Sequence, residues 1–287
     1  MSIEEDNIVG ELAQRQPTIV IRPRRGWLGL NLRELWAYRD LLLILAGRDV
    51  KVRYKQTFLG VTWVILQPLV TAIIFTVVFG GFAQLPSDGF PYILFVFSGL
   101  LPWNLFSASI SRAGGSLVGN ANLISKVYFP RLLVPLASIG AILIDFAVSF
   151  LVLVILMIAY KVDISWRILA LPPFLLLALL TAIGVSLWLS ALSVYYRDFM
   201  FAIPFLIQAW TYASPVAYAM SIVPEKWRWL VSLNPAVGFI EGFRWALLGS
   251  NSLTLDMVLI STASCLVFFF SGLYIFRYME RGFADVI

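Results

Sequence analysis

The sequence predicts an all-α protein embedded in a membrane, and its composition and patterning carry that prediction. Of the 287 residues, 60% are hydrophobic and only 13% are charged. A typical soluble domain has roughly 25% charged residues, so this chain has too little charge to cover a surface in water. Its apolar residues also form runs long enough to cross a bilayer. A soluble enzyme is therefore a poor fit to this sequence.

The chemistry that the sequence lacks narrows its function further. The chain has no histidine and one cysteine, Cys265. It therefore offers no His-dependent acid–base group, no Cys/His metal site and no intrachain disulfide. None of its lysines follows a glycine, which leaves no P-loop for ATP hydrolysis. The close pairs of acids that a membrane transferase would need lie only in the N-terminal tail. We therefore expect no catalytic residue, no metal and no cofactor in this chain. We expect a protein that moves a substrate and does not transform it.

Two segments precede the first expected span. Residues 1–30 are polar and lack the apolar core of a signal peptide, so we expect a cytoplasmic tail and assign it no role. In residues 31–56, apolar side chains fall near one helical face and basic ones lie mostly elsewhere. This pattern is typical of an amphipathic helix that lies in the membrane interface. A plain anchor held by anionic lipid would have the same pattern.

Six transmembrane helices are expected in the body of the chain, residues 57–280, each long enough to cross about 30 Å of hydrocarbon. They lie near residues 59–82, 92–111, 131–160, 168–194, 199–220 and 257–276. Counted over alternate loops, 16 Lys and Arg fall on the side of the tail and 5 on the other. The positive-inside rule then places both termini, including residues 281–287, in the cytoplasm. This topology explains the net charge of +5 without a nucleic-acid partner.

The loop at residues 112–130 is longer than a simple connection needs. Gly114 and Gly115 end the second span, and Asn120 and Asn122 can cap a short helix ahead of Pro130. The loop could present this helix to a cytoplasmic partner, and a floppy loop is the alternative.

On the external side, residues 236–248 are too few to span the membrane and too apolar to sit in water. They follow a turn at Ser232–Pro235 and stop at Gly249, which fits a short re-entrant or interfacial helix before the last span. Glu241 and Arg244 stand one turn apart and can pair on the polar side of this helix.

Asp145 is the only acid well inside an expected span. A carboxylate there is costly and is a functional candidate by default. It could instead be protonated, or bonded to Ser or Thr hydroxyls of a neighbouring helix. A proton-coupled carrier that uses Asp145 is one alternative function. Most of the aromatic side chains are expected to pack, while a minority could line a path for sugars, whose rings stack on aromatic faces.

Several motifs then occur in a characteristic order: RELWAYRDLLLILAGRDVKVRYKQTFLG, WVILQPL, NANLISKVYFPRLLVPL, YYRD at Tyr195–Asp198, and SLNPAVGFIEGFRWALLG. Together they make residues 31–280 resemble the membrane subunit of ABC-2 type polysaccharide exporters. These are the permeases of O-antigen, capsule and teichoic acid often called Wzm, KpsM or TagG. The tail before residue 31 is longer than in the shorter members.

The resemblance implies a homodimer that binds two copies of a separate ATPase subunit, which carries the ATP and Mg²⁺. It implies export of a long glycan, linked to undecaprenyl diphosphate, from the cytoplasm across the bacterial inner membrane. Within the same class, a drug or a small lipid is the alternative substrate.

The resemblance also assigns roles to residues. Contact with the ATPase is expected at Arg39, Asp40, Asn120, Asn122, Leu123 and Ile124. A basic entrance for the lipid diphosphate is expected at Arg53, Lys55, Lys126 and Arg131, which could equally be ordinary positive-inside charges. The glycan path and lateral gate are expected at Trp63, Phe75, Phe79, Phe205, Trp210, Tyr212 and Tyr218. The external gate is expected at Phe239, Glu241 and Arg244.

Overall fold

The computed structural model describes residues 32–55, 62–163 and 165–286, and every regular element in these ranges is helical. The longer helices are α3 (Arg39–Tyr54), α4 (Thr62–Phe75, continued by the π-helical η1, Thr76–Phe82), α5 (Tyr92–Gly114), α8 (Leu133–Ala159), α9 (Leu171–Tyr195, preceded by η2, Trp166–Ala170), α10 (Phe199–Ala213), α12 (Pro235–Leu248) and α13 (Leu255–Met279). The short elements are α2 (Leu32–Ala37), α6 (Ser116–Gly119), α7 (Ala121–Lys126), η3 (Met220–Ile222), α11 (Glu225–Ser232), η4 (Glu280–Gly282) and α14 (Phe283–Val286). The expected tail at residues 1–30 lies outside the described residues.

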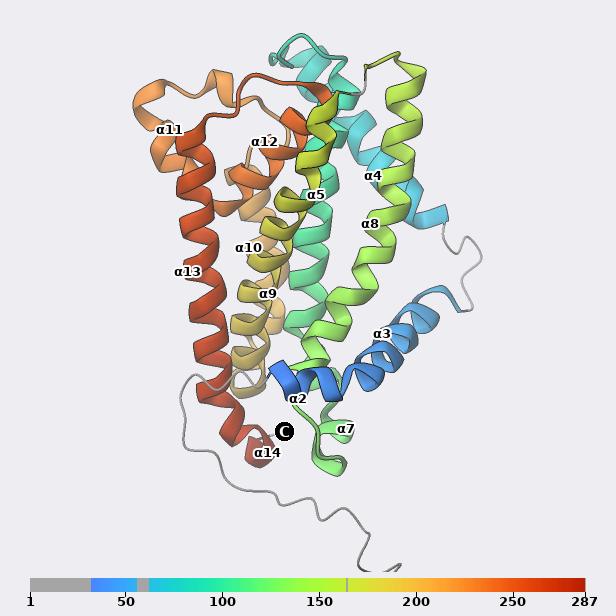
Figure 1. The fold of residues 1–287 in the computed structure, drawn as a ribbon, viewed down its shortest axis with the longest axis vertical. Coiled ribbons are helices and arrows are strands. Elements are labelled where there is room, and N and C mark those ends of the chain that lie inside the picture. The colour runs from blue at the N-terminus through green and yellow to red at the C-terminus, as the bar shows by residue number, and fades with distance from the viewer. Residues whose placement is uncertain (1–31, 56–61, 164, 287) are drawn as a thin grey trace, which may run out of the picture.

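The helices form an elongated bundle with distinct ends (Figure 1). We call one the α7 end, where α2, α3, α7 and α14 lie, and the other the α12 end, where α11 and α12 lie. At the α7 end, Tyr195 donates a hydrogen bond to the carbonyl of Met279 (3.2 Å). At the α12 end, Arg167 donates to the carbonyl of Gly249 (3.1 Å). The first and last described helices, α2 and α14, lie at the same end, as the expected topology requires (Figure 1).

Five helical stretches of the described residues are long and apolar enough to cross a membrane: Thr62–Phe82, Tyr92–Gly114, Leu133–Ala159, Trp166–Tyr195 and Leu255–Gly282. They correspond to five of the six expected spans, although residues 59–61 lie outside the described part of the first.

The remaining expected span, residues 199–220, is helical only as far as Ala213. Ser214 has an extended backbone (φ −109°, ψ 148°), because the following Pro215 disfavours the helical conformation of the residue before it and has no N–H to donate. The chain still passes from the α7 end to the α12 end here, through α10 and the irregular segment Ser214–Ala219 (Figure 1).

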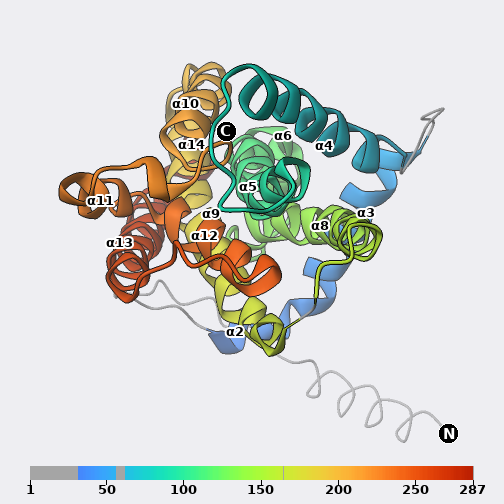
Figure 2. The same cartoon turned by 90° about the horizontal axis from the view of Figure 1, so that it is seen from above.

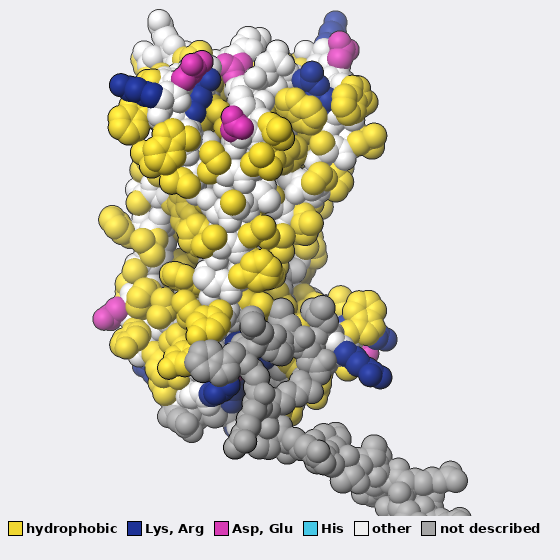
Figure 3. Space-filling view, turned by 60° about the vertical axis from the view of Figure 1, so that its left-hand side comes forward, with side chains coloured by type: hydrophobic (Ala, Val, Ile, Leu, Met, Phe, Trp, Pro, Cys, Tyr) yellow, Lys and Arg dark blue, Asp and Glu magenta, His cyan; other side chains and the backbone are white. Residues whose placement is uncertain are grey.

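Helix α5 forms the centre of the bundle, with α4, α8, α9, α10 and α12 packed around it (Figure 2). Within its most apolar window 78% of the residues are buried, against 11% in the α4 stretch. Hydrophobic side chains cover the middle of the molecule, and charged ones gather toward the two ends (Figure 3). A contiguous apolar surface of this extent is unusual for a soluble monomer and suits a bilayer.

The expected interface helix at residues 31–56 is two helices in the structure. The chain bends at Tyr38, whose φ of −97° and ψ of 16° are not helical, so that α2 and α3 run in different directions (Figure 1). Helix α3 packs along α8, and Leu45 on its inner side is buried. Residues 31 and 56–61 lie outside the described range.

Helices α9 and α13 cross at close range where a glycine of each faces the other. A Cβ added to Gly272 would lie 2.1 Å from the carbonyl oxygen of Gly184, and one added to Gly184 would lie 2.6 Å from the backbone of Phe268. Small residues that let backbones approach are a common basis of helix association in membranes. Neither position therefore has room for a side chain.

We expect Gly272→Ala to lower the thermal unfolding midpoint of the detergent-solubilised protein. The added methyl forces the helices apart, and overpacking of this kind costs about 1–3 kcal/mol. The matched control is Gly47→Ala in α3, where an added Cβ meets nothing within 4 Å. That control should leave the midpoint unchanged or raise it, because alanine favours helix over glycine. Equal midpoints for Gly272→Ala and the wild type would contradict the crossing.

Candidate functional site

At the α7 end, the structure joins two elements that the sequence predicts to contact a partner. Arg48 of α3 donates a hydrogen bond to Oδ1 of Asn120 (2.9 Å), and Nδ2 of Asn120 donates to the carbonyl of Ser116 (2.8 Å). Asn120 precedes α7, as expected, but its side chain does not cap the helix. Its amide is used to hold α3 against the loop.

The six residues expected to contact an ATPase divide into outward and inward groups. Arg39 and Asp40 are exposed near the start of α3, with 3.8 Å between their charged groups, and Asn122 is exposed on α7. Leu123 is half-buried and Ile124 is buried in an apolar cluster that also includes Leu117, Phe129 and Phe276. The inward residues anchor α7, and the outward ones leave a polar surface at this end.

The four basic residues expected at a diphosphate entrance do not form one cluster. Lys55 and Lys126 are exposed. Arg131 donates a hydrogen bond to the carbonyl of Glu280 and lies over the ring of Phe283, 5.9 Å from its centroid. Arg53 forms an ion pair with Asp145. Two of the four side chains are therefore engaged inside the protein.

Asp145 has partners that the sequence analysis did not foresee. Its carboxylate pairs with Arg53 and accepts a hydrogen bond from the hydroxyl of Tyr54, both at the end of α3. From the sequence, a protonated carboxyl or a bond to Ser or Thr hydroxyls was the structural alternative to a functional role. The Asp145 side chain is only 13% exposed. Burial lowers the pKa of Arg53, and the positive charge of Arg112 lowers it further. An arginine remains charged through such a shift, because its ordinary pKa is far above neutral.

The expected aromatic path has packed members and exposed members. Trp210 is fixed: its Nε1 donates to Oδ1 of Asn234 (2.8 Å), and its ring lies 5.0 Å from that of Phe106 between centroids. Phe75 and Phe79 meet edge to face at 5.3 Å. The exposed members, with their exposed fractions, are Trp63 (54%), Phe205 (71%) and Tyr212 (69%). These three lie on α4 and α10, which flank α5 (Figure 2).

At the α12 end, the expected short helix is present as α12, with Pro235 at its start and Gly249 in the left-handed conformation (φ 79°) at its end. Glu241 and Arg244 pair, as expected, at 2.7 Å. Both side chains are fully buried, so the expectation of a pair on the polar side of the helix is wrong. Phe239 is fully buried beside them on the same helix.

The guanidinium of Arg244 binds the irregular segment that follows α10. It donates to the carbonyls of Pro215 (2.7 Å), Val216 (2.7 Å) and Tyr218 (3.2 Å). It also donates to the carbonyl of Phe95 in α5 (3.2 Å) and lies over the Phe95 ring, 3.7 Å from its centroid. The carbonyls of Pro215, Val216 and Tyr218 lie outside any helix, and one side chain satisfies all three.

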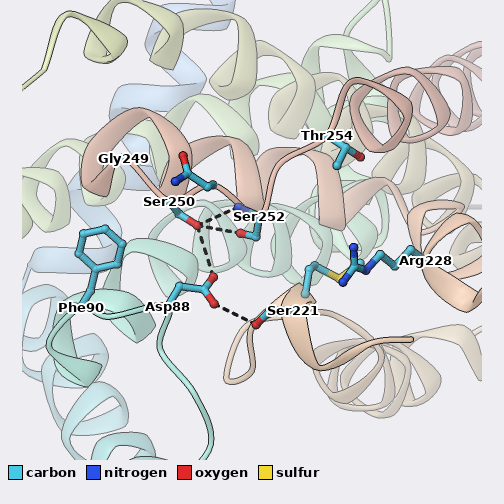
Figure 4. A pocket seen from close by; sticks show the side chains of 10 residues that line it. Asp88, Phe90, Ser221, Arg228, Gly249, Ser250, Ser252 and Thr254 are labelled. Atoms are coloured by element: carbon cyan, nitrogen blue, oxygen red, sulfur yellow. Dashed lines mark hydrogen bonds between the residues drawn. The ribbon is translucent and has the colours of Figure 1, made fainter. Parts of the chain in front are cut away.

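Glu241 extends this network to the loop between α4 and α5. Its second carboxylate oxygen accepts from Ser252 (2.6 Å), which shares a hydrogen bond with Ser250 (2.7 Å). Asp88 accepts from Ser221 (2.9 Å) and more weakly from Ser250 (3.4 Å). Figure 4 shows Asp88, Ser221, Ser250 and Ser252 around an open cavity of about 450 Å³. The α4–α5, α10–α11 and α12–α13 connections are thus linked by hydrogen bonds at the α12 end.

Sequence reasoning missed the Arg48–Asn120 bond, the Arg53–Asp145 pair and the role of Asp88. For the second, the sequence signals only that an acid inside a span needs a cation, and it does not indicate which one. Asp88 has no such signal, since its partners lie more than 130 residues away along the chain. In the part of the chain that the structure describes, no cluster of acids and cysteine could hold a metal ion.

A bundle of apolar helices with charges gathered at its ends defines a multi-pass membrane protein. Residues 40–248 match the family of ABC-2 type transporters, and the chain belongs to that family. It is 29% identical over 252 residues to an O-antigen export system permease protein RfbA of Klebsiella pneumoniae, covering 86% of this chain and 95% of the relative. It is 27% identical over 258 residues to the RfbA of Myxococcus xanthus, covering 89% and 98%. The polysialic acid transport protein KpsM of Escherichia coli is 25% identical over 245 residues, covering 82% and 92%.

We expect Arg244→Met to destabilise the protein strongly. Removing one partner of a buried ion pair leaves the other charge uncompensated, which costs about 3–5 kcal/mol. The control is Arg39→Met in α3, whose Nε is 3.8 Å from Oδ1 of the 81% exposed Asp40. Loss of an exposed pair of that kind costs about 0–1 kcal/mol.

The measurement is the thermal unfolding midpoint of each purified variant, together with protease cleavage between α10 and α11. Arg244→Met should lower the midpoint and open this segment to cleavage, whereas Arg39→Met should do neither. Equal behaviour of the two variants would show that Arg244 does not hold Ser214–Tyr218.

Proposed function

We propose that the chain is the membrane subunit of an ATP-driven exporter that passes a lipid-linked, O-antigen-like polysaccharide out of the cytoplasm. The observation that carries the proposal is the set of relatives, named for O-antigen export and polysialic acid transport, which align over more than four fifths of the chain. Both of these named cargoes are polysaccharides. The polymer is linked to undecaprenyl diphosphate in this proposal, and the exporter lies in the bacterial inner membrane.

A separate ATPase subunit supplies the energy in this proposal, since the chain has no P-loop. The ATPase, with its ATP and Mg²⁺, docks at the α7 end, which faces the cytoplasm together with both termini. The exposed Arg39, Asp40 and Asn122 form the contact surface. The Arg48–Asn120 bond supports a joint role for α3 and α7, because it makes the two elements one platform.

Two copies of the chain complete the pathway. One chain offers exposed aromatic side chains on α4 and α10, which flank α5. In a homodimer with two ATPases, Trp63, Phe205 and Tyr212 of each copy line the glycan path and the lateral gate. The exposed Lys55 and Lys126 receive the diphosphate at the cytoplasmic side.

The sixth crossing of the membrane is made by α10 and the irregular segment after it. Helix α10 has 15 residues, and at about 1.5 Å per residue it is about 22 Å long, short of the roughly 30 Å of hydrocarbon. Irregular backbone at that depth is tolerated only where its polar groups are satisfied within the protein. The bonds from Arg244 support this reading. In the same proposal, α12 is a re-entrant helix that closes the external exit.

A proton-coupled carrier that uses Asp145 is less well supported. The carboxylate is paired with Arg53 and accepts a hydrogen bond from Tyr54, which is the environment of a fixed ion pair. A drug or small lipid remains the alternative cargo within the same family, and the experiment below separates it from a polysaccharide.

Deleting the gene should remove the polysaccharide from the cell surface and cause undecaprenyl-linked glycan to accumulate inside. The readouts are an immunoblot of surface polymer and analysis of lipid-linked precursors. Deleting the partner ATPase should give the same result, and the wild-type gene should restore export. Unchanged surface polysaccharide in the deletion strain would contradict the proposal and favour a drug or small lipid.

A further inference from the structure

We infer that Asp145 is a positioning residue that couples α3 to α8, so that movement imposed on the interface helix is transmitted to a membrane span. The inference rests on the proposed function, because it names the route by which work at the α7 end reaches the membrane. It assigns the ion pair of Asp145 and Arg53, with the hydroxyl of Tyr54, a role in transport.

The bond pattern of α3 supports this role. In its middle, Arg48 holds Asn120 of the α6–α7 loop. At its end, Arg53 and Tyr54 both hold Asp145 of α8. Between these points, Asp49 accepts a weaker hydrogen bond from Ser138 of α8 (3.4 Å). The same helix is therefore fastened both to the loop expected to contact the ATPase and to a span.

The position of Asp145 in α8 indicates that helix packing alone does not explain why a charged residue is there. It is residue 13 of the 27-residue α8, and the nearest buried positions of that helix are the uncharged Ala141, Ile142 and Ser149. A buried ion pair is a weak source of stability, because desolvation offsets the attraction, and an apolar pair of similar volume often serves as well. An ion pair instead fixes how the two helices are aligned, because its two charged groups are in contact only at one relative position of the helices. Such a contact suits a joint that must keep two helices in fixed relation.

The chain path makes the joint useful for transmission. Helix α8 follows α7 after a short connection. A push on α7 thus reaches α8 through the chain, and a push on α3 reaches α8 through Asp145. Without the side-chain joint, α3 could slide along α8 while the ATPase still bound and turned over.

The test compares export with ATP hydrolysis in the full complex of this chain and its ATPase. The variants are Asp145→Asn, Arg53→Gln, the milder Tyr54→Phe, and the reciprocal swap Arg53→Asp with Asp145→Arg. The control is Asp198→Asn, an exposed carboxylate in the turn between α9 and α10. Surface polysaccharide is measured in a deletion strain that expresses each variant. ATP hydrolysis and ATPase co-purification are measured on the purified complex.

Asp145→Asn and Arg53→Gln should lower surface polysaccharide about tenfold, a typical size for coupling between sites. ATP hydrolysis should stay within about twofold of the wild type, and the swap should restore part of the export. Tyr54→Phe should lower the ratio of export to hydrolysis by a smaller factor, and Asp198→Asn should leave it unchanged. Loss of coupling with the ATPase still bound and active is not expected from a residue that only maintains the fold.

Normal export by Asp145→Asn, or a proportional fall of export and hydrolysis, would overturn the inference. If Asp145→Asn does not yield a folded complex, Tyr54→Phe decides, and an unchanged ratio for that variant would also overturn it. Failure of the proposed function looks different, because the deletion strain would then keep its surface polysaccharide before any variant is introduced.

Discussion

The buried guanidinium of Arg244 is the contact on which the α12 end depends. It lies where no water reaches it, and its partners are the carboxylate of Glu241 and four backbone carbonyls from two other segments. The carbonyls of Pro215, Val216 and Tyr218 lie outside any helix, and leaving such polar groups unsatisfied in an apolar interior is costly. Gly99 makes room for the guanidinium, since an added Cβ would lie 2.8 Å from its Nη2. One arginine thus allows the chain to leave the helix after α10 without a large penalty.

This arrangement has a consequence for transport. The proposed sixth span is helical for only part of its length, and side-chain bonds from α12 hold its irregular part. Such a span can change conformation more readily than a continuous helix. The same α12 is joined through Glu241 and Ser252 to the loop around Asp88. In the proposed exporter, closure at the exit and the shape of the lateral gate are therefore mechanically linked. The α7 end has its own set of bonds around α3, so the two ends of the pathway are organised by different residues.

The sequence predicts most of the helices, because their boundaries are local. Pro235 and Gly249 delimit α12 within one residue of the expected range, and Gly114 ends α5 as expected. The end of α10 was missed: hydropathy extends through residue 220, while the conformational effect of Pro215 stops the helix at Ala213. The partners of Asp145 were missed for a different reason. They come from residues about 90 positions away, and no local pattern specifies which cation an acid in a span will meet.

In the proposed exporter, α10 and the Arg244-bound segment after it form a sixth crossing of the membrane. The turn before α10 and the loop after this segment then lie on opposite sides of the membrane. This arrangement is tested most directly by single cysteines at Asp198→Cys and Ser221→Cys, both exposed positions, after replacing the buried Cys265 by serine. Each is labelled with a membrane-impermeant maleimide in right-side-out and inverted vesicles. If the sixth crossing exists, Ser221→Cys is labelled only in right-side-out vesicles and Asp198→Cys only in inverted ones. Labelling of both from the same side would contradict it.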